Sequence, residues 1–143
     1  MADSRTVFID ARPEDEYTVS HIPRAVRVDP KLDGDALAET LRSALSGRDG
    51  EVSDVIVYCS VGERSSALIE RACKFLTVDE QKRFKNLEGG IFAWASAKLP
   101  LDGERGRQGK VHGFDPIWKH LLPEHQRFLP EDQRAPRRSQ TTV

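Results

Sequence analysis

The six residues 54–59, DVIVYC, restrict the fold of this chain more than any other segment. An almost unbroken apolar run of this length is typical of a parallel strand that is buried on both faces of its sheet. A turn containing Gly62 follows, and residues 64–76 then repeat apolar side chains at helical spacing. A buried strand that leads through a tight turn into a helix is the repeating unit of a parallel α/β sheet.

The rest of the chain up to Pro100 alternates between strand-like and helix-like segments in the same way. Runs rich in β-branched and aromatic residues predict further strands at 5–10, 25–29 and 83–90. Apolar side chains at helical spacing predict helices at 33–46, 64–76 and 91–100, and a further helical turn is expected after Pro13. This alternation favours an α/β fold around a central, mainly parallel sheet.

The chain has 143 residues, enough for one domain with a single core. We expect that domain over residues 1–103 and a C-terminal extension over 104–143, partly docked and disordered at its end, where apolar residues become scarce. A net charge of −1 predicts no nucleic-acid binding, and no apolar run approaches the roughly 20 residues of a membrane span. The acidic start carries no export signal, so we expect a cytoplasmic protein with free thiols.

Cys59 stands at the carboxyl end of the central predicted strand, where open parallel sheets form their ligand sites. Gly62 allows the following turn to point successive backbone amides inward. Together with the N-terminus of the next helix, these amides favour an ionised sulfur, and Arg64 adds a cationic fork that can hold an oxyanion. A lone cysteine is more often a small buried residue, but this combination predicts a nucleophile.

Three separated stretches contain motifs in a fixed order. The loop CSVGERS occupies residues 59–65, VFIDARPEDEYTVSHIPRAV occupies residues 7–26, and NLEGGIFAWASAKLPL occupies residues 86–101. The first resembles the active-site pattern CxxGxRS of the single-domain rhodanese family of sulfurtransferases. The other two resemble that family's N-terminal and C-terminal signatures. The resemblance covers about residues 5–101.

This resemblance implies a rhodanese-like fold, with helices on both faces of the central sheet. It also implies an enzyme, a thiosulfate sulfurtransferase-like transferase. Cys59 would take a sulfane sulfur from a small-molecule donor as a persulfide and pass it to a thiol, to cyanide or to a protein acceptor. Substrate binding would fall to the loop residues Ser60, Val61, Gly62, Glu63, Arg64 and Ser65. No metal or organic cofactor is implied, because sulfur itself is the carried group.

The charge of the loop bears on the sulfur donor. Ser60 and Val61 are neutral and Glu63 is acidic, whereas family members that favour thiosulfate often carry more positive charge here. We therefore hypothesise a less charged donor, such as a persulfide of glutathione or cysteine.

Several residues outside the loop have both a functional and a structural interpretation. Asp10 and Arg12 could brace the Cys59 loop or steer an anion, and a salt bridge that fixes two loops is the favoured interpretation. His21 is expected to tie neighbouring loops by hydrogen bonds rather than to shuttle protons. Cys73 and Trp94 are expected in the core. The histidines of the extension lack the neighbouring carboxylates or cysteines and the close spacing of a metal site. We interpret them as tail residues: His112, His120 and His125.

Two other functions stay open. Dual-specificity phosphatases of the cell-cycle type and arsenate reductases resemble rhodaneses but place five residues between cysteine and arginine, which makes room for a tetrahedral oxyanion. Only residues 60–63 separate Cys59 from Arg64, so the loop favours a single sulfur atom. A rhodanese-like domain can also serve as a sulfur carrier or interaction module, typically when its cysteine is lost. The presence of Cys59 weakens that alternative.

Overall fold

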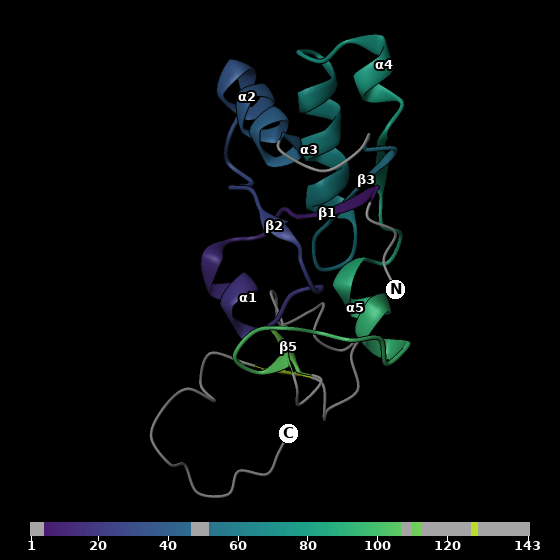
Figure 1. Cartoon of the computed structure of the whole chain (residues 1–143). Coiled ribbons are helices and arrows are strands. Elements are labelled where there is room, and N and C mark those ends of the chain that lie inside the picture. The colour runs from purple at the N-terminus through teal and green to yellow at the C-terminus, as the bar shows by residue number, and fades with distance from the viewer. Residues whose placement is uncertain (1–4, 47–51, 107–109, 113–126, 129–143) are drawn as a thin grey trace, which may run out of the picture.

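The computed structural model describes residues 5–46, 52–106, 110–112 and 127–128, and four strands among them form one parallel sheet (Figure 1). Its order is β2-β1-β3-β4. The strands are β1 (Thr6–Asp10), β2 (Val26–Arg27), β3 (Asp54–Tyr58) and β4 (Phe84–Asn86). β3 pairs with β1 along its whole length and with β4 on its other side, all in parallel. The predicted α/β fold with a parallel sheet around residues 54–58 is thus confirmed.

Helices cover both faces of this sheet. They are α1 (Glu14–Val19), α2 (Gly34–Leu45), α3 (Glu63–Cys73), α4 (Val78–Gln81) and α5 (Gly90–Ser96). In Figure 1, α2 and α3 lie on one side of the strands, and α1 and α5 lie on the other. Among the described residues, no helix has the length and apolar character needed to cross a membrane.

Each face of the sheet has its own apolar core, because side chains alternate along a strand. Val7 and Ile9 of β1 join the cluster beneath α2 and α3, whereas Phe8 packs on the opposite side. The buried residues of that second cluster come from the segment between α1 and β2, from β3, from α5 and from the chain after α5: Ile22, Ala25, Tyr58, Ile91, Phe92, Ala95, Leu101 and Val111. The sheet is therefore packed against apolar side chains on both of its faces.

The C-terminal segment adds a small second sheet beside the domain. β5 (Val111–His112) pairs in parallel with β6 (Arg127–Phe128), and β5 lies against α1 and α5 (Figure 1). Val111 is fully buried in the second core. Of the C-terminal extension predicted over residues 104–143, the structure describes residues 104–106, 110–112 and 127–128, and the remaining residues lie outside the described part of the chain.

Candidate active site

Cys59 directly follows β3 and is only 1% exposed. The chain then turns at Gly62, which has a φ of +109°, and enters α3 at Glu63. The backbone N–H of Gly62 donates to Cys59 Sγ at 3.2 Å, and the N–H of Ser65 donates to it at 3.4 Å. A positive φ at Gly62 is what lets both amides face the sulfur, since other residues adopt this conformation only with strain. The sequence predicts inward-pointing amides here, and in the structure the amides of Gly62 and Ser65 face the sulfur.

Ser65 and Asn86 hold this turn in shape. The hydroxyl of Ser65 lies 3.4 Å from Cys59 Sγ and 2.5 Å from Asn86 Oδ1. A hydroxyl has one proton, so the shorter contact with Asn86 takes it and leaves the two backbone amides as the donors to the sulfur. Asn86 Nδ2 in turn donates to the carbonyl of Gly62 at 3.1 Å. Asn86, at the end of β4, therefore fixes the turn from outside.

The N-terminus of α5 holds the loop from the other side. The N–H of Ile91 donates to the Cys59 carbonyl at 2.9 Å, and the N–H of Phe92 donates to the Ser60 carbonyl at 3.1 Å. Gly90 lies so close to the loop that an added Cβ would be 2.3 Å from the Ser60 carbonyl oxygen. The glycine pair of the C-terminal motif is needed for this approach, because any side chain at Gly90 would displace the loop.

The guanidinium of Arg64 forms an ion pair with the carboxylate of Glu16. Its Nη1 and Nη2 donate to Glu16 Oε2 and Oε1 at 3.2 and 3.1 Å, and Nη2 also donates to Ser60 Oγ at 2.8 Å. Glu16 comes from α1 and is 4% exposed. The sequence predicts Arg64 as a fork for an oxyanion, and in the structure both terminal nitrogens of this guanidinium face the Glu16 carboxylate. Of the other loop residues, Ser60, Gly62 and Ser65 are buried, Val61 is half-buried, and Glu63 is exposed.

Asp10 and Arg12 form a fully buried salt bridge, as the favoured interpretation predicted. Arg12 Nε and Nη2 donate to the two Asp10 oxygens at 2.8 and 2.7 Å, and Nη2 also donates to the Ser20 carbonyl at 2.7 Å. Tyr58 donates to Asp10 Oδ2 at 2.6 Å and accepts from the N–H of Ile22 at 3.0 Å. Burial, followed by the Asp10 carboxylate, raises the pKa of Tyr58 well above its usual range. This network joins β1, β3 and the loop before β2 beneath the site, away from solvent.

His112 is not the solvated tail residue that the sequence suggested. It lies on β5 with 8% of its surface exposed, and its Nε2 is 3.7 Å from Asp15 Oδ2 of α1. Burial lowers the pKa of His112, while Glu16 and Asp15 oppose that shift. His120 and His125 lie outside the described residues. The sequence contained no local signal for this position, because β5 is two residues long and its place depends on tertiary packing.

The other singled-out residues have structural roles. His21 ties its loop to α1, as predicted: its Nδ1 lies 2.9 Å from the Tyr17 carbonyl, and the two rings stack at 3.8 Å. Cys73 is a free cysteine and is half-buried rather than part of the core. Trp94 is half-buried too and packs edge-on against Phe8 with centroids 5.6 Å apart.

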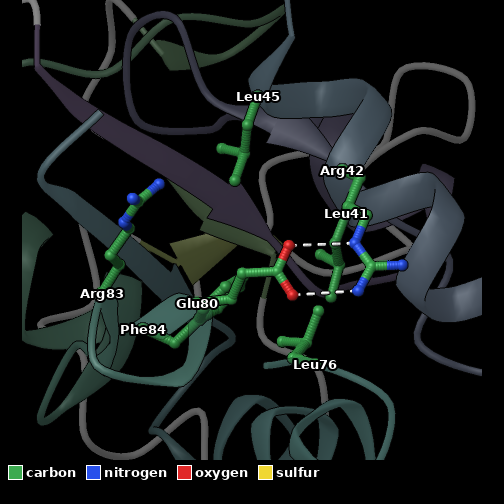
Figure 2. Close-up of a pocket in the computed structure, with 7 residues that line it drawn as sticks. All are labelled: Leu41, Arg42, Leu45, Leu76, Glu80, Arg83 and Phe84. Carbon is green, nitrogen blue, oxygen red and sulfur yellow. Dashed lines mark hydrogen bonds and ion pairs between the residues drawn. The ribbon is translucent and has the colours of Figure 1, made fainter. Parts of the chain in front are cut away.

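A small cavity of about 150 Å³ lies at the other end of the sheet, where β4 begins. Figure 2 shows the carboxylate of Glu80 facing the guanidinium of Arg42 beside this cavity. The pair is bidentate, with distances of 3.0 and 2.9 Å, and it lowers the pKa of Glu80 to about 2. The cavity is lined by Leu41, Arg42, Leu45, Leu76, Glu80, Arg83 and Phe84. It contains no residue of the Cys59 loop.

Comparisons with known proteins identify the family of this chain. Residues 1–97 match the rhodanese-like domain family. The chain belongs to this family. A sulfurtransferase of Allochromatium vinosum is 31% identical over 107 residues, which is 74% of this chain and 88% of the relative. An adenylyltransferase and sulfurtransferase of Caenorhabditis briggsae is 33% identical over 95 residues, 66% of this chain but 22% of that protein.

The fold likeness extends to solved structures. The rhodanese-like domain of an Anabaena protein has a TM-score of 0.53 and 21% identity, and the match covers 71% of this chain and 67% of that one. This supports the rhodanese-like fold alone. Together with the family match, the relatives named as sulfurtransferases place the chain in a sulfur-transfer family.

Proposed function

We propose that this protein is a sulfurtransferase in which Cys59 carries sulfur as a persulfide. The observation that carries the proposal is the pair of amides, from Gly62 and Ser65, that point at Sγ of a buried cysteine. Backbone amides stabilise a thiolate at no cost in reorganisation, and a buried setting strengthens their effect. The same amides would stabilise Cys59 again each time it is released as a thiolate.

Two nucleophilic displacements make up the cycle. The Cys59 thiolate attacks the sulfane sulfur of the donor, forming an S–S bond while the donor's own bond to that sulfur breaks. The electron pair leaves with the donor residue, as sulfite from thiosulfate or as a thiolate from a persulfide. A thiolate or cyanide then attacks the outer sulfur, and Cys59 leaves as a thiolate. No net oxidation or reduction is required.

For the donor, we infer a thiol persulfide rather than thiosulfate. Glu16 faces Arg64 with both carboxylate oxygens, and Glu63 adds an exposed negative charge beside the loop. Such a site offers a dianion such as thiosulfate little net positive charge, whereas a persulfide can keep its charged groups remote from the reacting sulfur. Cysteine and glutathione persulfides are therefore the preferred candidates.

Replacing Glu16 tests the donor inference. Glu16→Gln keeps the side-chain shape but removes the charge that neutralises Arg64, so we expect the KM for thiosulfate to fall by roughly three- to tenfold, the scale of a partly screened ion pair. The KM for cysteine persulfide should change less than twofold. If wild-type protein used thiosulfate far better than any persulfide, the donor inference would be wrong.

Steady-state transfer tests the role of Cys59. The wild-type protein should transfer sulfur to cyanide or to a thiol, and Cys59→Ser should lose this activity. Cys73→Ser is the matched control, because it removes the other thiol of the chain and should keep the activity. If Cys59→Ser retained full activity, or if the wild-type protein hydrolysed a phosphate ester and transferred no sulfur, the proposal would be refuted. Wild-type protein without either activity would favour an interaction module.

A further inference from the structure

One titratable side chain reaches the neighbourhood of Arg64 from the C-terminal segment and has no part in the cycle above. His112 lies on β5, which packs against α1 and α5, and only 8% of its surface is exposed. Its Nε2 lies 3.7 Å from Asp15 on the first turn of α1. The next residue of that turn is Glu16, the carboxylate that binds Arg64. His112 and Arg64 thus contact adjacent residues of the same helical turn.

The charges around His112 come from three elements. α1 contributes Asp15 and Glu16, the segment before it contributes Arg12, and α3 contributes Arg64. The two carboxylates favour the protonated imidazole, and the two guanidinium groups oppose it. α5 contributes no charged residue, and β6 pairs Phe128 with His112 and Arg127 with Val111.

We propose that His112 is a positioning residue that sets how completely Glu16 neutralises Arg64, and with it the affinity of the site for an anionic sulfur donor. The inference rests on the proposed sulfurtransferase function. When His112 is neutral, Arg64 is the cation that the Glu16 carboxylate neutralises. When His112 is protonated, the imidazolium attracts the carboxylates of Asp15 and Glu16 and repels the guanidinium of Arg64. The site then has more positive charge, so an anionic donor binds more tightly.

The direction of the pH effect follows from the surroundings. Burial lowers the pKa of His112 from its ordinary value of 6.5, so the imidazole is neutral at pH 7 and gains its proton only in more acidic solution. The KM for thiosulfate should then fall as the pH falls below about 6.5. Comparing the KM of each variant with that of the wild-type protein at every pH separates the effect of His112 from pH effects that the proteins share.

The experiment measures kcat and KM for thiosulfate between about pH 5 and pH 8. We expect the wild-type KM to fall by roughly three- to tenfold over this range, the scale of a partly screened charge interaction. His112→Gln should abolish that fall. Asp15→Asn, at an exposed position that cannot disturb the core, should move the fall to lower pH. His21→Gln is the matched control and should behave like the wild-type protein, since His21 contacts Tyr17 instead.

An NMR titration of the imidazole provides a readout that does not depend on sulfur transfer. The pKa of His112 should fall further in Glu16→Gln, because the Glu16 carboxylate raises it. An unchanged pH profile in His112→Gln, or an unchanged His112 titration in Glu16→Gln, would overturn this inference and leave the proposed function standing. A wild-type protein that transfers no sulfur from any donor would overturn the proposed function, and with it the inference.

Discussion

Replacing Gly90 with alanine places one methyl group between α5 and the loop that holds Cys59. The new Cβ would lie 2.3 Å from the Ser60 carbonyl oxygen, 2.5 Å from its carbon and 2.6 Å from the Cys59 carbonyl oxygen. Real Cβ atoms essentially never approach closer than 3.0 Å, and all three neighbours are backbone atoms that cannot rotate away. The loop or the helix must therefore move by more than half an ångström.

Two costs combine in Gly90→Ala. The residue has a φ of +60°, where a side chain costs roughly 1–2 kcal/mol. The forced shift of a packed segment adds roughly 1–3 kcal/mol. We therefore expect a loss of roughly 2–5 kcal/mol in the free energy of unfolding. The same shift carries Cys59 away from the amides of Gly62 and Ser65, and a misplacement near 1 Å costs on the order of 100-fold in rate.

Gly34→Ala is a matched control for this substitution. Gly34 has nearly the same φ, +62°, but its added Cβ would meet only a carbon of Phe75, at 4.0 Å. It starts α2, away from the Cys59 loop. Gly34→Ala should thus lose roughly 1–2 kcal/mol and keep the wild-type rate of sulfur loading.

The assay combines urea denaturation of both variants with the rate at which a persulfide donor loads sulfur onto Cys59. Folded Gly90→Ala that loads sulfur within threefold of the wild-type rate would refute the claim that α5 fixes the geometry of the loop. Equal losses of stability in the two variants would show that the positive φ, and not the close approach, is the whole cost.

Two further predictions concern residues outside the loop. Tyr58→Phe removes the hydroxyl that donates to the buried Asp10 and accepts from the N–H of Ile22, so the free energy of unfolding should fall by roughly 2–4 kcal/mol; a loss below about 1 kcal/mol in urea denaturation would contradict this. Glu80→Gln removes the ion pair with Arg42, which is largely exposed and should contribute less than about 1 kcal/mol. Because the pKa of Glu80 is lowered to about 2, that contribution is complete above the ordinary value of 4.5 and fades as the pH falls toward 2. The difference in the free energy of unfolding between wild-type protein and Glu80→Gln should therefore be smaller near pH 3 than at pH 7. A larger difference near pH 3 would contradict this prediction.

Much of the fold could be predicted because its signals are local. The apolar run of β3 and the helical spacing of α2 and α3 depend on neighbouring residues alone, and all three elements are present. β4 ends at Asn86, earlier than predicted, because the glycine pair Gly89 and Gly90 takes positive φ and turns the chain. α4 was missed since four residues show no periodicity, although Thr77 and Glu80 form the capping box that marks its start.

The candidate site divides in the same way. Cys59, Gly62 and Ser65 lie within seven residues of sequence, so the amides around the sulfur follow from one strand, one turn and one helix start. The partners supplied from elsewhere could not be predicted locally. Glu16 lies 48 positions from Arg64, and its pairing depends on how α1 packs under the loop. The interpretation of His112 as a tail residue is wrong for the same reason, because only the docking of β5 brings it beside α1.

The central claim is that Cys59 carries the transferred sulfur, and an intact-mass measurement tests it most directly. The protein is incubated with cysteine persulfide or thiosulfate and separated from excess donor. Its intact mass is then measured before and after addition of cyanide. Wild-type protein and Cys73→Ser should each gain the mass of one sulfur atom and lose it to cyanide, while Cys59→Ser should gain none. Sulfur on Cys59→Ser, or none on the wild-type protein from either donor, would contradict the account.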